Sequence, residues 1–444
     1  MKKLLVLTTT VIMSTLFAST VLAADWEKIN NDWYYKENNT NVTNKWVKHE
    51  NNYYYLGSDG KMLTDTVVED DDNLYYVNSS GARVSNEWRE LDDSRLEKGW
   101  YYFGSDGKAL TLEKSKLHTI NGKRYIFDED GLMLYGWIDE DYSQVDSYED
   151  GVYYCGEYDD GAISEGWRAI DVDTDDDNYL DHYWFYFTAS TGKKTINYDS
   201  RNINGQIYGF DENGVMRFGF SKVSEDSEDE SEVAGYKYYN DYDNGSMVKS
   251  DWFYVEPDEN IHSDAEDNAW FYANSNGTLK ANTVASIKNQ KYAFNEYGEM
   301  LYGLIGLKLD GSKIVEYTDI IEDEDELNAL DDDFKVYYFG NKNDGSMKKN
   351  VQNIVLEGDS YTFNFSSNGE GKEGIYKNGI YVHGLKQKAD PDYGLSIIRF
   401  DDKEYLVNTS GDIIKNKTNI KDEDGYYYCT DKDGIVTYKS SSKK

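Results

Sequence analysis

The sequence predicts an all-β fold, an elongated solenoid of stacked β-hairpins, and three observations lead to this prediction. Three stretches repeat nearly the same sequence: INGKRYIFDEDGLMLYGW at 120–137, INGQIYGFDENGVMRFGF at 203–220 and IKNQKYAFNEYGEMLYGL at 287–304. Their turn glycines, Gly131, Gly214 and Gly298, lie 83 and 84 positions apart, which is typical of a repeat architecture. In addition, 42 Tyr, 16 Phe and 10 Trp can supply an aromatic core, and only two prolines interrupt strand pairing.

A smaller unit lies inside the long repeat, formed by an aromatic triplet, a polar turn with a glycine, and a second short strand. Examples are YYYLGSDGKML (53–63), WYYFGSDGKAL (100–110), WFYANSNGTLK (270–280) and YYYCTDKDGIV (426–436). Asp-Gly and Asn-Gly turns supply positive φ between aromatic or β-branched runs, so each unit is expected to be a β-hairpin. An isolated hairpin cannot bury its aromatic face, and units of about twenty residues must therefore stack on their neighbours.

The repeats suggest a division of the chain in which three hairpins form one long repeat. The expected segments are a signal peptide (1–23), N-terminal hairpin repeats (24–72), three three-hairpin repeats (73–137, 151–220 and 235–304) and a C-terminal region (335–444). A fourth copy begins near 335 and then loses the pattern. The last segment is therefore expected to hold degenerate repeats or a cap.

The N-terminus has the pattern of a secretory signal peptide. Lys2 and Lys3 precede an apolar run, and small residues lead to a cleavage position after Ala23. The alternative is an uncleaved membrane anchor, but the run is short and is broken by threonines. No later stretch is apolar enough to span a bilayer, so we expect a secreted mature chain without a transmembrane segment.

The charge of the chain argues against nucleic acid as a partner. Without Lys2 and Lys3, 44 basic residues stand against 84 acidic ones, so the mature net charge is about −40. Nucleic-acid binding depends on neutralising phosphates with Lys and Arg, and this composition offers no excess of either.

Two cysteines, Cys155 and Cys429, stand where the repeat otherwise has Phe. The sequence favours two unpaired hydrophobic fillers over a disulfide, because a bridge would have to join distant parts of the predicted solenoid.

The repeat pattern also carries a family resemblance. An aromatic triplet, a turn glycine, a Met or small residue and then Gly-Trp occur in YIFDEDGLMLYGW (125–137) and YYCGEYDDGAISEGW (153–167). This pattern resembles the cell-wall-binding repeats of Gram-positive bacteria, called choline-binding repeats, which are related to glucan-binding repeats and to repeats of clostridial toxins. The likeness covers almost the whole mature chain. It leaves choline, glucans and other glycans open as ligands, because one scaffold serves all of them.

The resemblance implies aromatic cages between successive hairpins, in which two Trp and one Tyr hold a quaternary ammonium by their ring faces. Carried over by position, the first Trp would be Trp33, Trp100, Trp184 or Trp270; the second would be Trp46, Trp88, Trp137, Trp167 or Trp252; and the Tyr would be Tyr35, Tyr54, Tyr102 or Tyr154. The alternatives are that these rings form the core of the solenoid or stack on sugars. Because no Trp follows Trp270, complete cages are expected only in the first two thirds of the chain.

Acidic insertions at 89–99, 168–183 and 255–269 follow the first hairpin of each long repeat. The middle insertion places Asp171, Asp173, Asp175 and Asp177 at the alternate spacing of a calcium loop, so calcium is a candidate ligand. Asp176 replaces the usual turn glycine and His182 the usual bidentate Glu. A solvated acidic loop is the simpler interpretation.

The sequence contains no pattern typical of a catalytic site. The five histidines, His49, His118, His182, His262 and His383, have no partner at a motif spacing. We therefore expect a non-enzymatic protein at the cell surface that needs no cofactor and binds choline groups of teichoic acid or a related glycan. The alternative is a structural surface protein or adhesin whose repeats act as a spacer and bind a host or partner glycan or protein.

Overall fold

The computed structural model describes residues 25–113, 115–171, 182–224, 231–265 and 267–444. Within these ranges the regular structure is β-strand except for one short helix, α1 (Glu324–Asn328), which confirms the predicted all-β hairpin fold. Contacts divide the chain into two units: unit 1 extends to Asn197 and includes 212–215, and unit 2 comprises 198–211 and 216–444. The finer division into three-hairpin repeats stays a prediction.

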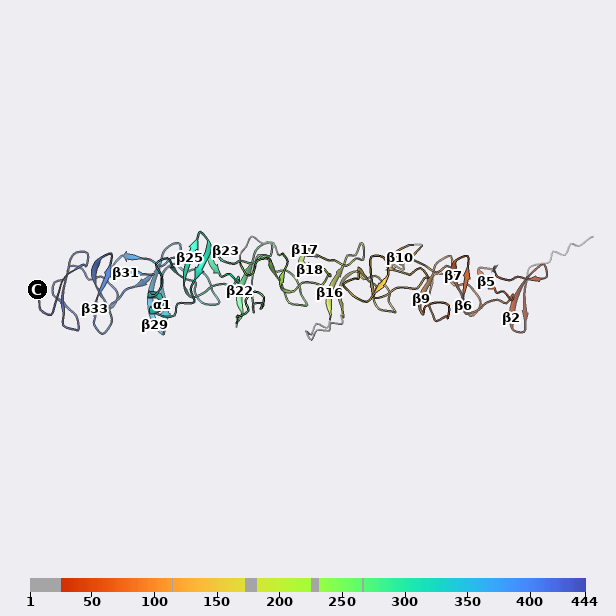
Figure 1. Cartoon of the computed structure of the whole chain (residues 1–444), viewed down its shortest axis with the longest axis horizontal. Helices are drawn as coiled ribbons and strands as arrows, with labels where there is room; N and C mark the ends of the chain where they lie inside the picture. Colours follow the sequence, from red (N-terminus) through yellow and green to blue (C-terminus); the bar gives the residue numbers. More distant parts are fainter. Residues whose placement is uncertain (1–24, 114, 172–181, 225–230, 266) are drawn as a thin grey trace, which may run out of the picture. The chain divides into compact units, whose positions relative to one another are not determined.

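Unit 1 is a succession of antiparallel hairpins. Its strands are β1 (Asp25–Ile29), β2 (Asp32–Glu37), β3 (Thr40–Asn41), β4 (Lys45–His49), β5 (Asn52–Leu56), β6 (Thr66–Asp70), β7 (Asn73–Val77), β8 (Glu87–Leu91), β9 (Gly99–Phe103), β10 (His118–Ile120), β11 (Lys123–Tyr125), β12 (Trp137–Ile138), β13 (Gln144–Val145), β14 (Tyr153–Tyr154), β15 (Gly166–Ile170) and β16 (Tyr183–Phe187). Strands adjacent in sequence pair with each other, as in β4–β5, β6–β7 and β8–β9, and β5, β7 and β9 follow one another in chain order in Figure 1.

Unit 2 continues with hairpins and adds two larger sheets. Its strands are β17 (Tyr198–Ile203), β18 (Gln206–Phe210), β19 (Gly219–Lys222), β20 (Tyr236–Tyr239), β21 (Asp251–Val255), β22 (Ala269–Ala273), β23 (Thr283–Ile287), β24 (Gln290–Phe294), β25 (Leu304–Asp310), β26 (Lys313–Tyr317), β27 (Lys335–Tyr338), β28 (Asn350–Leu356), β29 (Asp359–Phe365), β30 (Gly374–Tyr376), β31 (Gly379–Val382), β32 (Leu385–Lys386), β33 (Leu395–Phe400), β34 (Lys403–Asn408), β35 (Ile420–Lys421), β36 (Tyr427–Thr430) and β37 (Val436–Ser440). The five-stranded sheets have the orders β24-β23-β26-β25-β27 and β28-β29-β32-β31-β30.

The placement of the hairpin turn differs from the sequence prediction. The aromatic strand pairs mainly with the strand before it, as β6 does with β7 through a turn in which Asp71 and Asp72 have φ of 49° and 58°. Such a two-residue turn with positive φ matches the twist of the paired strands, and Asp tolerates this conformation. In most units a single residue pairs back after the glycine turn, as in the bridge Val77↔Arg83. The last unit is an exception, because β36 pairs with β37 across its glycine turn as the sequence predicted. The other units are therefore hairpins followed by a glycine turn.

The acidic insertions also lie elsewhere than predicted. The insertion at 255–269 connects β21 to β22, and the one at 89–99 connects β8 to β9, so each is the loop of a single hairpin. The two strands that flank an insertion therefore face each other across one hairpin.

Successive hairpins are joined through the residue two positions after each turn glycine, which we call the plus-two residue. Its backbone N–H donates to a carbonyl of the preceding hairpin: Met133 N to Trp100 O and Met300 N to Trp270 O, each at 2.8 Å. This hydrogen bond ties one aromatic strand to the next turn. The repeat therefore stacks by backbone pairing as well as by side-chain burial.

The side chain of the plus-two residue lies against the turn glycine of the next hairpin. A Cβ built on Gly161 would stand 2.2 Å from Met133 Sδ, and one on Gly345 would stand 2.1 Å from Met300 Sδ. Both glycines also have positive φ, of 60° and 61°. Glycine is required there for conformation and for space.

Aromatic residues supply much of the core, as the composition indicated. Fully buried rings that recur at the ends of the aromatic strands include Phe103, Phe187, Phe210, Phe294 and Phe365. Cys155 and Cys429 are buried and free, which confirms that they act as hydrophobic fillers.

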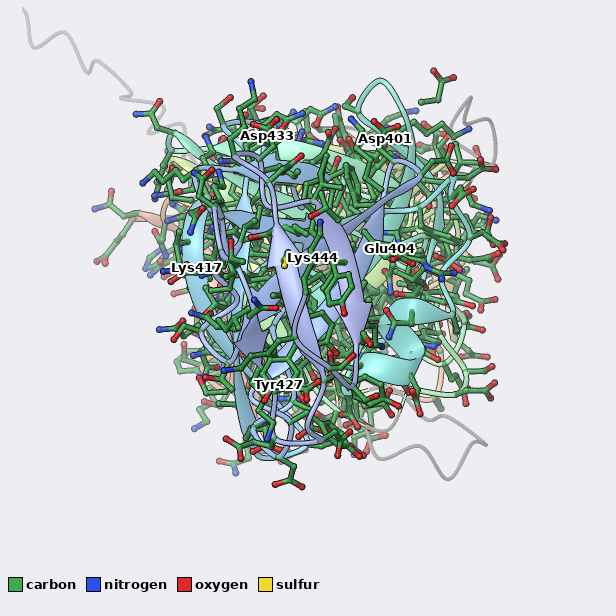
Figure 2. The ribbon with its side chains drawn as sticks, turned by 90° about the vertical axis from the view of Figure 1, so that its left-hand side faces the viewer. Asp401, Glu404, Lys417, Tyr427, Asp433 and Lys444 are labelled. Carbon is green, nitrogen blue, oxygen red and sulfur yellow. The ribbon has the colours of Figure 1, made fainter. Side chains whose placement is uncertain are left out.

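The C-terminal sheet β35-β36-β37 ends unit 2, and Figure 2 shows Tyr427 and Lys444 at this sheet. Lysines from the end of the chain cover its tyrosines: Lys443 Nζ lies 5.8 Å from the Tyr427 ring centroid and Lys444 Nζ 5.7 Å from that of Tyr438. Cation–π contacts with the chain's own lysines thus shield the last aromatic face.

The glycine contact can be tested with a matched pair of substitutions. Gly161→Ala and Gly122→Ala both place Ala at positive φ, which costs about 1–2 kcal/mol. A Cβ at Gly122 meets nothing within 4 Å, whereas one at Gly161 meets Met133. Denaturant unfolding should show Gly161→Ala to be less stable than Gly122→Ala by about 1–3 kcal/mol, the usual penalty of overpacking. Equal losses would mean that the contact with Met133 does not constrain the stack.

Candidate functional site

Hairpin β21–β22 places two indoles on the same face. Trp252 on β21 pairs with Tyr272, and Trp270 stands two residues before Tyr272 on β22. The ring centroids of the two Trp residues are 6.3 Å apart and their planes are at 86°. Both side chains are half-buried, so the hairpin presents an open corner with two perpendicular walls.

A third wall comes from the next hairpin. The ring of Tyr292, on β24, lies 4.8 Å from that of Trp252 with an interplanar angle of 65°. The plus-two residue Met300 packs against these three rings. The resulting cavity of about 230 Å³ is lined by Trp252, Trp270, Tyr292, Met300, Asn343 and Asp344, and we call it the 252–270 cage.

The chemistry of this cage suits a bulky cation that forms no hydrogen bonds. Its walls offer ring faces, which carry the negative side of the aromatic quadrupole. In the part of the chain that the structure describes, Trp270 Nε1 is buried without a hydrogen-bond partner.

An acidic side chain stands at the edge of the cage. Burial acts to raise the pKa of Asp344, but hydrogen bonds from Lys348 and Ser346 outweigh it and hold the pKa below its usual value. Asp344 is therefore ionised at neutral pH, and it forms an ion pair with Lys348 at the edge of the cage.

Unit 1 contains an equivalent group of residues. Trp88 on β8, Trp100 on β9 and Tyr125 on β11 pack around the plus-two residue Met133 in one cluster. The Trp88 and Tyr125 rings are 5.0 Å apart at 62°. Trp100 Nε1 donates to Asp159 Oδ1 at 3.1 Å, so here the indole N–H is satisfied by a carboxylate at the edge of the cage.

A third set lies at the start of unit 1. Trp26 and Trp33 have ring centroids 6.4 Å apart and planes at 89°, and Tyr54 from the next hairpin is 5.4 Å from Trp26. Trp33 is 40% exposed. The plus-two residue is Met62, whose N–H donates to Trp33 O at 2.8 Å.

The sequence of the chain matches two family patterns. Residues 40–83 match the choline-binding repeat family, and residues 97–109 and 265–279 match the cell wall binding repeat family. These segments overlap the hairpins that carry Trp46, Trp100 and Trp270. Residues 40–83, 97–109 and 265–279 are therefore repeats of the choline-binding and cell wall binding type.

Solved structures of choline-binding proteins resemble the chain at low identity. Choline binding protein F from Streptococcus pneumoniae, in the presence of a peptidoglycan analogue, is 21% identical over 79% of this chain and 99% of that one, with a TM-score of 0.37. The modular autolysin LytC from the same organism is 16% identical over 88% of this chain and 52% of that one, with a TM-score of 0.22. No curated protein sequence matches the chain.

Other predicted cage residues have different surroundings. Trp167 and Trp184 form the same corner, with centroids 6.4 Å apart and planes at 81°. Their counterparts of Tyr292 and Met300 in sequence are Tyr208 and Met216, which belong to unit 2, whereas the two indoles belong to unit 1.

Trp137 lies in a hydrophobic core cluster with Ile170, Phe185 and Phe187. It is 7% exposed and contacts Tyr154 and Phe185, with ring centroids 5.0 Å and 5.1 Å away. The position two residues before Tyr154 is Val152, so this hairpin has no second indole. The structure thus does not assemble a Trp–Trp corner around Trp137.

Three predicted tyrosines lie behind an indole of their own hairpin. Tyr35, Tyr102 and Tyr154 are the cross-strand partners of Trp26, Trp88 and Trp137. Their ring centroids lie 5.2, 5.0 and 5.0 Å from those indoles. Of the predicted tyrosines, Tyr54 is the one placed as a third wall.

The sequence reasoning missed Trp26, the third walls Tyr125 and Tyr292, and the methionines. Tyr125 and Tyr292 occur in the recurring stretches RYIFDEDGLM and KYAFNEYGEM, each followed by its plus-two methionine at one fixed distance. This constant Tyr–Gly–Met spacing was the available signal. It was missed because the third wall belongs to the hairpin after the one that carries the two indoles.

Of the four predicted calcium ligands, one belongs to the residues that the structure describes. Asp173, Asp175 and Asp177 lie outside the described residues, and Asp171 is exposed. Among the residues that the structure describes, no group of three or more His, Cys, Asp or Glu could hold a metal ion. In the same ranges, no helix is both long and apolar enough to cross a membrane.

Core and cage indoles should respond differently to truncation. Trp137→Ala is expected to destabilise unit 1 by about 3–5 kcal/mol, because it empties a buried aromatic site. Trp33→Ala removes a partly exposed ring whose edge contact with Trp26 contributes about 0.5–1.5 kcal/mol. Thermal unfolding followed by near-UV circular dichroism measures both, and similar losses would contradict the distinction between core and cage.

Proposed function

We propose that this protein is an exported, non-catalytic surface protein that attaches to the cell wall by binding choline groups of teichoic acid or a related envelope glycan. The 252–270 cage carries the proposal, because it joins two perpendicular indoles, a tyrosine and a methionine around a small cavity with an ionised carboxylate at its edge. Each ring face contributes about 0.5–2 kcal/mol to holding a quaternary ammonium.

The arrangement of the rings favours an ammonium over a sugar. A sugar stacks flat on one exposed ring, whereas the walls of this cage meet at 86° and 65° and enclose a rounded group. The flanking methionine adds an apolar, adaptable surface that suits N-methyl groups. A planar ligand would contact one wall at a time.

Repetition supports attachment in preference to capture of free choline. The sets around Trp26, Trp88 and Trp252 lie in different hairpins of one chain. Several weak sites that engage one polymer give an avidity far above that of a single cage. A wall polymer that carries many choline groups is the kind of ligand that such an array would retain.

A sedimentation assay with purified choline-containing cell walls tests the proposal. The full chain should sediment with the walls and be released by excess free choline. The triple variant Tyr54→Ala, Tyr125→Ala, Tyr292→Ala removes one wall from each set and should weaken each site by about 2- to 30-fold. Tyr393→Ala, which changes a tyrosine that is 47% exposed, is the control and should sediment like the wild type.

Two results would overturn this proposal. One is a wild-type chain that does not sediment with walls. The other is sedimentation that neither choline nor the triple variant reduces, which would favour an adhesin that binds another surface component.

A further inference from the structure

The plus-two residue is a cation in one repeat that has three aromatic walls. Arg83 stands two residues after Gly81. Its guanidinium carbon lies 4.3 Å from the ring centroid of Tyr53, 5.5 Å from that of Trp46 and 5.7 Å from that of Tyr75. One side-chain cation therefore contacts three rings at cation–π distance.

These three rings occupy the same strand positions as the walls of the 252–270 cage. Trp46 pairs across β4–β5 with Tyr55, and Tyr53 stands two residues before Tyr55, as Trp270 does before Tyr272. Tyr75 comes from the next hairpin, and its ring lies 5.1 Å from that of Trp46. Arg83 thus occupies the place that an external ligand takes in an open cage.

A second repeat uses a lysine in the same way. Lys194, two residues after Gly192, places its Nζ 5.3 Å from the Trp137 ring centroid and 5.8 Å from that of Phe185. Its ammonium also donates to the carbonyl of Tyr148. The buried indole that lacks a second Trp is therefore covered by a cation of its own chain.

Methionine is the plus-two residue where two indoles form a corner and a third ring completes it. Met62, Met133 and Met300 hold this position beside Trp33, Trp100 and Trp270. A methionine adds no charge, and the cavity beside Met300 stays open.

The three aromatic rings, and not a carboxylate, are the partners of the Arg83 guanidinium. In the described ranges no carboxylate forms an ion pair with Arg83, although the chain carries a net charge of −38. A guanidinium stacks well on aromatic faces and is weakly hydrated, which suits this position.

We propose that the plus-two residue determines which cages accept an external quaternary ammonium. Methionine leaves the cage open, whereas Arg83 fills it with the chain's own cation and turns it into a structural junction. Lys194 covers the buried ring of Trp137 in a hairpin that has no second indole. The proposal rests on the proposed function, since it assumes that open cages bind choline.

The two kinds of residue occupy similar space, so they can be exchanged. A Cβ on Gly107 would meet Arg83 Nε at 2.4 Å, just as one on Gly345 would meet Met300 Sδ at 2.1 Å. Met300→Arg should therefore place a guanidinium in the 252–270 cage while the contact with the next glycine turn is kept.

The test counts choline sites by isothermal titration of the full chain. Met300→Arg should lose one site relative to the wild type, and the control Met300→Leu should keep it. Arg83→Met should gain one site at Trp46, seen as a new choline-dependent quenching of Trp fluorescence that Trp46→Phe abolishes in that background. Circular dichroism establishes that each variant is folded, and if Met300→Arg does not fold, the Arg83→Met arm decides.

The outcomes separate the two proposals. A wild-type chain that binds no choline refutes the proposed function. A wild-type chain that binds choline, with an Arg83→Met variant that gains no site or a folded Met300→Arg variant that loses none, refutes only the role of the plus-two residue.

Discussion

The contact between a plus-two side chain and the turn glycine of the next hairpin sets the geometry of the rest of the structure. The backbone of the plus-two residue bonds to the preceding hairpin, and its side chain abuts the following one. One residue thus links three consecutive hairpins. Because the glycine leaves no room for a Cβ, the spacing between hairpins is tightly constrained, and a ring on one hairpin can complete a corner on another.

This constraint couples stability to recognition. The residue that joins the stack also lines the cage, so a change at Met300 or Arg83 alters both packing and ligand access. Methionine and arginine fit the same slot because both have long, unbranched stems. A substitution between methionine and arginine at the plus-two position is therefore expected to open or close a cage while the hairpin stack is kept.

The hairpin stack could be predicted because the aromatic triplets and turn glycines recur at a regular spacing. The first strand of each hairpin was misplaced because strands such as β6 (TVVED) lack the aromatic run of their partners. Trp252 and Trp270 were both predicted, but they are separated in sequence by a long acidic loop within one hairpin. The third ring and the methionine come from the next hairpin, and only the register of the stack places them.

Under the proposed function, the acidic surface and the aromatic cages would act on opposite charges of the same ligand. A choline-bearing wall polymer presents ammonium groups beside phosphates, and a chain of net charge −38 repels the phosphates while it attracts the ammonium. At physiological ionic strength this repulsion is screened beyond about 8 Å, whereas the ring contacts act at van der Waals distance. The ligand is thus expected to enter with its ammonium first and to keep its phosphate in solvent. In this proposal the internal cation Arg83 supplies charge of the same sign as choline to rings that would otherwise form a further cage. The plus-two residue would thus limit the number of binding sites without a change of fold.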